Sequence, residues 1–427
     1  MSKLLKAISG AAALLFACLA FLVAAVLDRA PAVPAAPIPD AQDVRSAVQL
    51  VQLAQGLMLQ AEPVPAEVPQ PWLEAAHRLV GYAKDNLAID GIIDDRGATF
   101  RLSKRVMTHG WINIAVRLDE TKGGSTPKLS LNIGRFRVAD IVTATALNAG
   151  FALMRHDGET ARSFADIVPH FRTDESSLAA TARLPRQVVG TLQAVFSPGP
   201  GAGVDIAHVR AYYGDLLAYA VRSGERSYPQ LIRHVALGVR DQDDLKAAII
   251  ALTMYVDGPR VRRLAGERSA TPPCILPPQP AFLQGRDDLP KHWTISAALA
   301  LFMNQRTARA VGLWKELDDS LPGGDGLAAG SGFSFVDLGA DTGGVALGMV
   351  ARDSAGLESA LRALRSGRDE VILPSAILRL PEGVPLTVFQ KSYGGLEQPR
   401  MRAAEARIGS SLRQSPLYAG SPFIAPR

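Results

Sequence analysis

Five ionisable side chains between residues 288 and 348 have the types and spacing of a chemical site. They are His292, Glu316, Asp319, Asp337 and Asp341. One imidazole among several carboxylates suits a hard divalent cation such as Mg²⁺ or Mn²⁺, or Zn²⁺ with mixed ligands, and such a cation lowers the pKa of bound water. The predicted metal ligands are His292, Glu316, Asp337 and Asp341, and the predicted catalytic residues are His292, Glu316, Asp319 and Asp341.

Two alternatives use the same residues without a metal. A carboxylate whose pKa is raised by burial can work with His292 as a pair of general acid and base. A buried hydrogen-bond network can instead fix how two helices pack, with no chemical role. The sequence leaves all three interpretations open, because it does not show whether the side chains line an open pocket or are sealed from solvent.

Helical periodicity places some of these residues on two stripes, which we expect to face each other. His292, Ser296 and Ala300 recur every fourth residue in an apolar segment. Asp341 and Gly344 lie on a second apolar segment, where small residues allow another helix to approach closely. Burying an unpaired carboxylate costs several kcal/mol, roughly. We therefore expect Asp341 to contact His292.

Helix capping explains part of this pattern without function. Ser334 and Asp337 are predicted to form a capping box, and Asp288 can cap the helix that begins near Pro290. Asp341 lies beyond the first turn, where neither a cap nor the helix dipole stabilises a carboxylate. Asp341 therefore points to a partner elsewhere in the chain.

The motif series resembles that of the YfiM-like predicted periplasmic lipoproteins and, more distantly, of the VanZ-like membrane proteins. The resemblance covers residues 288–348 and is carried by Asp288, His292, Ser296, Lys315-Glu316 with Asp319, and Gly332-Phe333-Ser334 followed by Asp337, Asp341 and Gly344. The Lys that follows the first Asp in that family is replaced by Leu289, and Lys291 precedes His292 instead. The resemblance implies a shared polar cluster in an envelope protein, without an activity.

Composition and missing signatures exclude several classes of function. The net charge of +5 is spread along the chain, so no nucleic-acid surface is indicated. The sequence contains no G-x-S-x-G elbow, phosphate-binding loop, H-E-x-x-H or paired C-x-x-C motif. Serine hydrolases, nucleotide enzymes and zincins are therefore disfavoured.

The N-terminal sequence predicts a membrane anchor. Residues 7–27 are apolar or small, and a run of this length crosses a hydrocarbon core of about 30 Å as a helix. Lys3 and Lys6 precede the run, which predicts a single-pass inner-membrane protein with a periplasmic body. A cleaved signal peptide is the alternative. The predicted parts are a cytoplasmic tip and transmembrane anchor over residues 1–27 and a Pro/Ala linker over residues 28–40.

The remaining chain predicts an α+β fold. Residues 41–200 combine an amphipathic helix over 41–60 with alternating segments at 98–102, 111–118 and 129–133, typical of a small antiparallel sheet covered by helices. Residues 201–427, which contain the motif region, are predicted to be mainly helical. The fold class expected for the whole chain is thus an N-terminal membrane helix, a small antiparallel sheet covered by helices, and a mainly helical C-terminal part.

We predict a binding or assembly role in the cell envelope for this protein. The alternative is a hydrolase that acts on an envelope lipid or cell-wall component through the His/Glu/Asp cluster, with or without a divalent metal. The expected partners are the inner membrane and such an envelope component. The substrate, protein partners and oligomeric state do not follow from the sequence.

Overall fold

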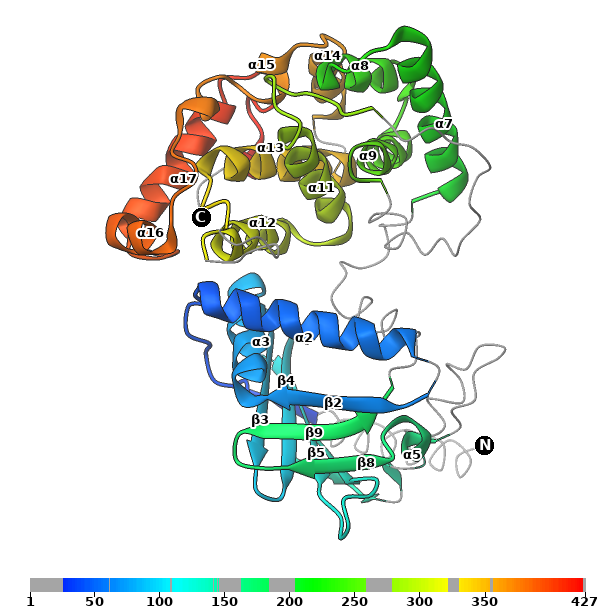
Figure 1. The fold of residues 1–427 in the computed structure, drawn as a ribbon, viewed down its shortest axis with the longest axis vertical. Helices are drawn as coiled ribbons and strands as arrows, with labels where there is room; N and C mark the ends of the chain where they lie inside the picture. The colour runs from blue at the N-terminus through cyan, green and yellow to red at the C-terminus, as the bar shows by residue number, and fades with distance from the viewer. Residues whose placement is uncertain are drawn as a thin grey trace, which may run out of the picture. The chain divides into compact units, whose positions relative to one another are not determined.

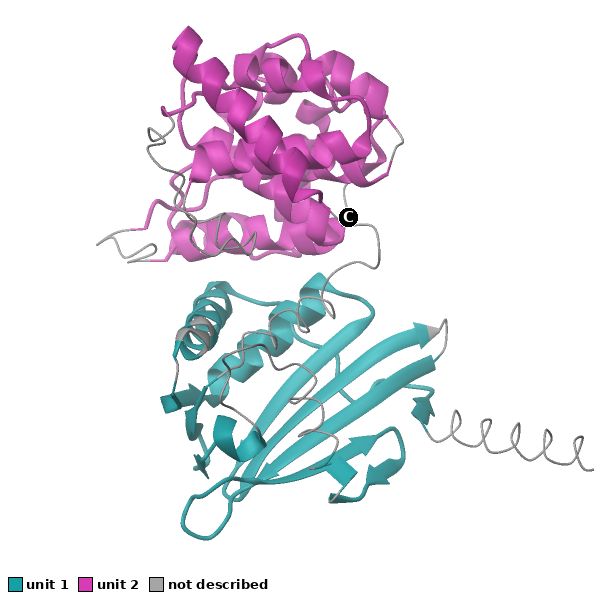
Figure 2. Ribbon diagram, turned by 90° about the vertical axis from the view of Figure 1, so that its right-hand side faces the viewer, with its two compact units in different colours: residues 1–193 teal, residues 194–427 magenta. Residues whose placement is uncertain are grey.

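The chain folds into two compact units, residues 1–193 and 194–427 (Figure 2). The computed structural model describes residues 26–60, 62–107, 110–140, 142–143, 145, 163–183, 204–258, 279–321, 330–353 and 356–424. The boundary expected at residue 200 lies outside these ranges.

The first unit contains two antiparallel sheets. The larger has the order β3-β4-β5-β6-β7, with β1 pairing β5, and the smaller has the order β2-β9-β8. The strands are β1 (Leu27–Asp28), β2 (Val64–Pro69), β3 (Leu87–Asp94), β4 (Gly97–Met107), β5 (Gly110–Asp119), β6 (Lys128–Ile133), β7 (Phe136–Val138), β8 (His170–Thr173) and β9 (Ser177–Ala182). The three alternating segments predicted from the sequence lie within β4, β5 and β6.

Helices cover part of these sheets. They are α2 (Ala41–Leu59), α3 (Gln70–Ala83) and α5 (Phe164–Ile167). α3 runs beside the edge strand β3 (Figure 1). Gln70 Nε2 donates to Gly91 O at 3.0 Å, Ile93 N donates to Gln70 Oε1 at 3.0 Å, and His77 Nδ1 lies 2.7 Å from Ile89 O. These bonds occupy backbone groups that an edge strand would otherwise offer to another chain.

The expected α+β class is confirmed, but the N-terminal membrane helix is not part of the observed fold. Within the described ranges, no helix has the length and apolar character needed to cross a membrane. Residues 7–25 of the expected span lie outside those ranges. Leu27, its last residue, lies in β1 and pairs with Ile112 of β5, and Asn113 Nδ2 donates to Asp28 Oδ2 at 2.8 Å. Strand pairing therefore accounts for the end of the apolar run, and the prediction of a membrane helix as part of the fold is wrong for that end, at Leu27. The cellular location stays an untested prediction.

The segment expected to act as a linker makes contacts with the first unit. Ala32 N and Val33 N each donate to Ser103 Oγ at 3.0 Å, and Val33 is buried. Ala36 packs on Gly81, where an added Cβ would lie 2.6 Å from the Ala36 Cβ. Residues 32–36 are thus held against the sheet and α3.

The second unit is helical, as predicted. Its helices are α7 (Ile206–Ser223), α8 (Tyr228–Gly238), α9 (Gln242–Asp257), α11 (Leu289–Phe302), α12 (Gln305–Asp319), α13 (Phe335–Arg352), α14 (Leu357–Leu364), α15 (Asp369–Ile372), α16 (Leu386–Tyr393) and α17 (Pro399–Leu412), with short 3₁₀ turns η2 (Ile377–Arg379) and η3 (Pro422–Ile424). α13 lies at the centre of this unit, and α9, α11, α12 and α17 pack around it (Figure 1). Every residue of α13 except Asp337, Met349 and Arg352 is buried.

Glycines let α11 and α13 touch backbone to backbone. A Cβ added at Gly344 would lie 1.9 Å from Trp293 O, and one added at Gly348 would lie 2.3 Å from Ala297 O. No side chain fits at either position without moving a helix. This close contact brings the polar stripe of α11 within hydrogen-bonding distance of the stripe on α13.

Candidate functional site

His292 lies at the centre of the polar cluster. Its helix α11 begins at Leu289, whose N–H donates to the Asp288 carboxylate at 2.9 Å, so Asp288 caps the helix as expected. His292 Nδ1 lies 3.3 Å from Asp341 Oδ1 and 4.0 Å from Glu316 Oε1. His292 Nε2 lies 3.6 Å from Asp337 Oδ2. The imidazole therefore has carboxylates at both of its nitrogens.

Asp341 comes from the middle of α13. Its Oδ1 accepts a hydrogen bond from Ser296 Oγ at 2.8 Å. Its Oδ2 is buried and has no hydrogen-bond partner among the described residues. This oxygen lies against α12 at Gly312, where an added Cβ would come within 2.7 Å of it. The expected contact between His292 and Asp341 is present, and Asp341 Oδ2 keeps no hydrogen-bond partner within the described ranges.

Glu316 lies on α12, and, as in Asp341, one of its carboxylate oxygens accepts a hydrogen bond from a described residue while the other does not. Its Oε2 accepts a hydrogen bond from Ser334 N at 2.9 Å, at the start of α13. Its Oε1 is buried and accepts no hydrogen bond within the part of the chain that the structure describes. Lys315 Nζ lies 3.8 Å from that oxygen. The side chain of Glu316 is only 1% exposed, so Oε1 has no access to bulk water to replace a partner.

Asp337 and Asp319 have other partners. Asp337 Oδ1 lies 3.3 Å from Arg286 NH2, and Asp337 N donates to Ser334 Oγ at 3.1 Å. Only the serine half of the expected capping box is therefore present, because the N–H of Ser334 donates to Glu316 Oε2 and not to Asp337. Asp319 is buried and forms an ion pair with Lys315. The structure thus brings three of the other four predicted residues around His292 and joins the last, Asp319, to them through Lys315.

Three of these residues have the arrangement of a metal site. One ligand atom each from His292, Glu316 and Asp341 can be chosen so that all lie within 4.8 Å of one another. The second carboxylate oxygen of Glu316 and of Asp341 accepts a hydrogen bond, from Ser334 N and from Ser296 Oγ respectively, and His292 Nε2 lies 3.6 Å from Asp337. Metal ligands in proteins are held in this way by surrounding hydrogen bonds. Asp337, predicted as a fourth ligand, lies outside this group and faces the other nitrogen of the imidazole.

Burial and charge shift the titration of the cluster. Burial alone would lower the pKa of His292, but the carboxylates of Asp341, Asp337 and Glu316 outweigh it and raise the pKa to about 9. Burial, with the negative charge of Asp337, raises the pKa of Glu316 to about 8. Burial also raises the pKa of Asp337. Near neutral pH the cluster therefore holds protons that the same groups in water would largely release.

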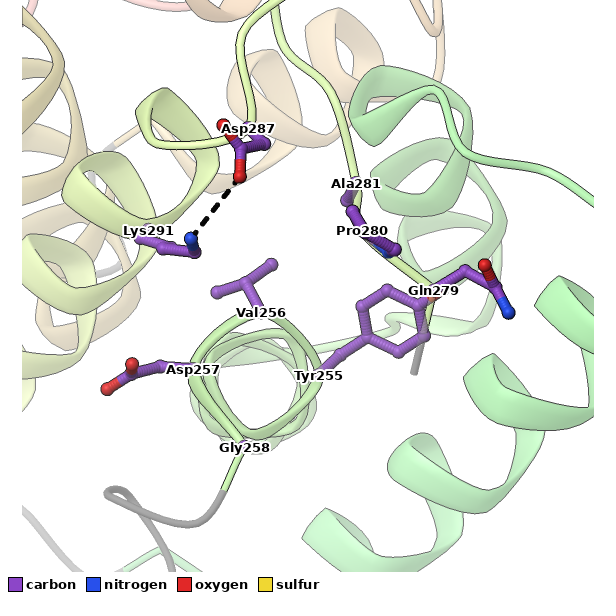
Figure 3. Close-up of a pocket in the computed structure, with 9 residues that line it drawn as sticks. All are labelled: Tyr255, Val256, Asp257, Gly258, Gln279, Pro280, Ala281, Asp287 and Lys291. Atoms are coloured by element: carbon purple, nitrogen blue, oxygen red, sulfur yellow. Dashed lines mark ion pairs between the residues drawn. The ribbon is translucent and has the colours of Figure 1, made fainter. Parts of the chain in front are cut away.

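The cluster is almost closed to solvent. The side chains of His292, Glu316, Asp337 and Asp341 are 10%, 1%, 14% and 6% exposed. A cavity of about 300 Å³ lies beside α11, the helix that carries His292 (Figure 3). Its lining consists of residues 255–258, residues 279–281, Asp287 and Lys291. Lys291 Nζ points toward Asp287 there, at 3.6 Å. None of the five predicted residues lines this cavity.

Three groups that the sequence did not predict also contact the cluster. They are Arg286, Gly312 and the backbone of Ser334. Arg286 and Ser334 belong to loops, and periodicity places only residues within helices and strands. Gly312 gave a weak signal, because glycine inside a helix marks a close approach.

Comparisons with known proteins leave this chain without a family assignment. No family model matches the sequence, and no curated protein or solved structure matches the chain.

Proposed function

We propose that the second unit binds one divalent transition-metal cation through a nitrogen of His292, Glu316 Oε1 and Asp341 Oδ2, and that this binding underlies its function. One observation carries the proposal: among the residues described, Glu316 and Asp341 each keep one buried carboxylate oxygen without a hydrogen-bond partner, and both residues lie beside the same imidazole. Leaving a buried charged group unpaired costs several kcal/mol, roughly. A cation between the three groups would offset that cost.

The donor set indicates which cation fits. One nitrogen and two carboxylate oxygens suit Zn²⁺, Mn²⁺ or Fe²⁺. Mg²⁺ fits less well, because it sheds its water reluctantly and proteins usually hold it through one or two carboxylates with several waters. Three protein ligands also leave room in the coordination sphere for water or a ligand.

Burial favours a binding role over hydrolysis of a large substrate. The candidate ligands are between 1% and 10% exposed, so a lipid or a wall polymer would have to displace neighbouring groups to reach them. A metal-dependent hydrolase remains the second candidate, because three protein ligands are typical of sites that activate water. A location in the cell envelope is part of the proposal and rests on the YfiM-like resemblance.

The test is cation binding by the full chain. After dialysis against a chelator, calorimetric titration with Mn²⁺ and with Zn²⁺ should show one site per chain. The variants His292→Gln and Glu316→Gln should lose this site. His234→Gln is the matched control, since His234 lies 2.7 Å from Asp215 in another His–Asp pair of the same unit. Absence of binding by the wild type, or equal loss in the control, would refute the proposal.

A further inference from the structure

Arg286 stands at the outer side of the cluster, in contact with three carboxylates. Its guanidinium donates to Asp288 at 3.0 Å and to Glu382 at 2.6 Å, and it lies 3.3 Å from Asp337. Asp288 and Glu382 are 42% and 48% exposed, whereas Asp337 is 14% exposed. Arg286 thus connects the surface of the unit to the carboxylate that faces His292.

A rigid turn fixes the backbone of Arg286. Leu283 and Arg286 exchange backbone hydrogen bonds of 2.9 and 3.0 Å around Gln284 and Gly285, whose φ angles are 53° and 77°. Positive φ at both central residues is the geometry of a type I′ turn, which is unusual for glutamine. Gln284 is held by Asp369 Oδ1 at 2.8 Å and by Leu373 O at 2.7 Å. These anchors stabilise a strained residue two positions before Arg286, as is common beside functional sites.

The contacts continue from Arg286 to the imidazole. Asp337 directs Oδ1 to Arg286 and Oδ2 to His292 Nε2. Asp337 near Nε2 and Asp341 Oδ1, 3.3 Å from Nδ1, each favour a proton on the nitrogen that they face while the site is empty. A cation at Nδ1 requires the ring form in which Nε2 carries the proton, and Asp337 stabilises that form. A carboxylate behind a ligating imidazole typically changes metal affinity by about 10–100-fold.

We infer that Arg286 is a positioning residue for the proposed cation site: Arg286 holds Asp337 so that His292 presents Nδ1 to the cation. This inference rests on the proposed function. The planar guanidinium contacts three carboxylates at once, which a lysine ammonium on a flexible stem does not reproduce. Arg286→Lys should therefore behave like Arg286→Met at the site, while keeping the positive charge.

The experiment compares the full-length wild type with Arg286→Met, Arg286→Lys and the control Lys291→Met. Lys291 is next to His292 and pairs with Asp287, so its replacement removes a nearby positive charge but leaves the contact between Arg286 and Asp337. Calorimetry with Mn²⁺ and Zn²⁺ should give affinities about 10–100-fold weaker for both Arg286 variants and close to wild type for Lys291→Met.

A second measurement needs no cation. Ring ¹⁵N chemical shifts of cation-free protein, recorded above the pKa of the ring and assigned with His292→Gln, should show a larger fraction of rings with the proton on Nε2 in the wild type than in the Arg286 variants. Wild-type affinity together with wild-type ring shifts in Arg286→Met would overturn the inference. If the wild type binds no cation, the proposed function fails, while the ring shifts still decide whether Arg286 positions His292.

Discussion

Replacing Gly344 by alanine should separate the two helices on which the candidate site is built. The new Cβ would lie 1.9 Å from Trp293 O and 2.8 Å from Trp293 C. Both atoms belong to the backbone of α11, so no side-chain rotation relieves the overlap. A carbon and a carbonyl oxygen come no closer than about 3.3 Å, so the helices must separate locally by about 1.4 Å.

The cost follows from two opposing effects. Overpacking a filled core costs about 1–3 kcal/mol, and a backbone overlap on this scale belongs at the upper end. Alanine in place of glycine within a helix returns about 0.5–1 kcal/mol. We therefore expect a net loss of about 2 kcal/mol in the free energy of unfolding. For a unit of this size that loss lowers Tm by about 4–8 °C.

Gly214→Ala is the matched control, because Gly214 lies within α7 and an added Cβ there meets no atom within 4 Å. Scanning calorimetry should show Gly214→Ala melting about 1–4 °C above wild type, since only the gain in helix propensity remains. Gly344→Ala should also weaken cation binding, because separation of the helices lengthens the 3.3 Å contact between His292 and Asp341. A Gly344→Ala protein that melts at or above the wild-type temperature would refute the packing argument.

Three further predictions concern the cluster itself. His292→Gln and Asp341→Asn should be non-additive by about 0.5–3 kcal/mol in urea unfolding, because each removes the same contact; additive losses would mean that the pair is not coupled. The pKa values of His292 and Glu316, about 9 and about 8, lie above the ordinary 6.5 and 4.5, so the folded state holds more protons than the unfolded state. These protons stabilise the folded state of the cation-free protein. Their contribution to the free energy of unfolding is fully present below the ordinary pKa values and is lost as pH rises through 8 and 9. Urea midpoints should therefore fall over that window, and Glu316→Gln should reduce the fall. Lys315→Met should tighten Mn²⁺ binding in calorimetry, because it removes an ammonium group 3.8 Å from Glu316 Oε1; weaker binding would contradict the assigned ligand atom.

The central contact of the site was predictable because it depends on helical periodicity. His292 and Ser296 lie one turn apart, and Asp341 was the carboxylate without a local explanation. Two polar stripes on buried helices satisfy their hydrogen bonds by facing each other, and glycine beside one stripe allows the helices to approach closely. The same local logic predicted the strands at 98–102, 111–118 and 129–133, where alternation is clear.

Contacts made by loops were not predictable in this way. Arg286 reaches Asp337 only because a type I′ turn at Gln284 is anchored on residues 369 and 373, far along the chain. Asp319 was expected beside His292, yet the lysine one turn before it captures its carboxylate. Leu27 pairs with Ile112 because of a distant strand, which an apolar run does not reveal.

The charges of the buried groups explain why a cation suits this cluster. Four carboxylates, those of Glu316, Asp319, Asp337 and Asp341, are at most 14% exposed. Lys315 supplies one positive charge, Arg286 is already shared with two exposed carboxylates, and a His292 that ligates a cation is neutral. The cluster therefore lacks about two to three positive charges, of which one divalent cation supplies two. Protons meet part of this deficit when no cation is bound, because burial and the negative charge of Asp337 raise the pKa of Glu316 to about 8. Because a metal ligand must be deprotonated, a cation that enters the site has to displace those protons, and its affinity should rise with pH over the same window in which the cation-free protein loses stability.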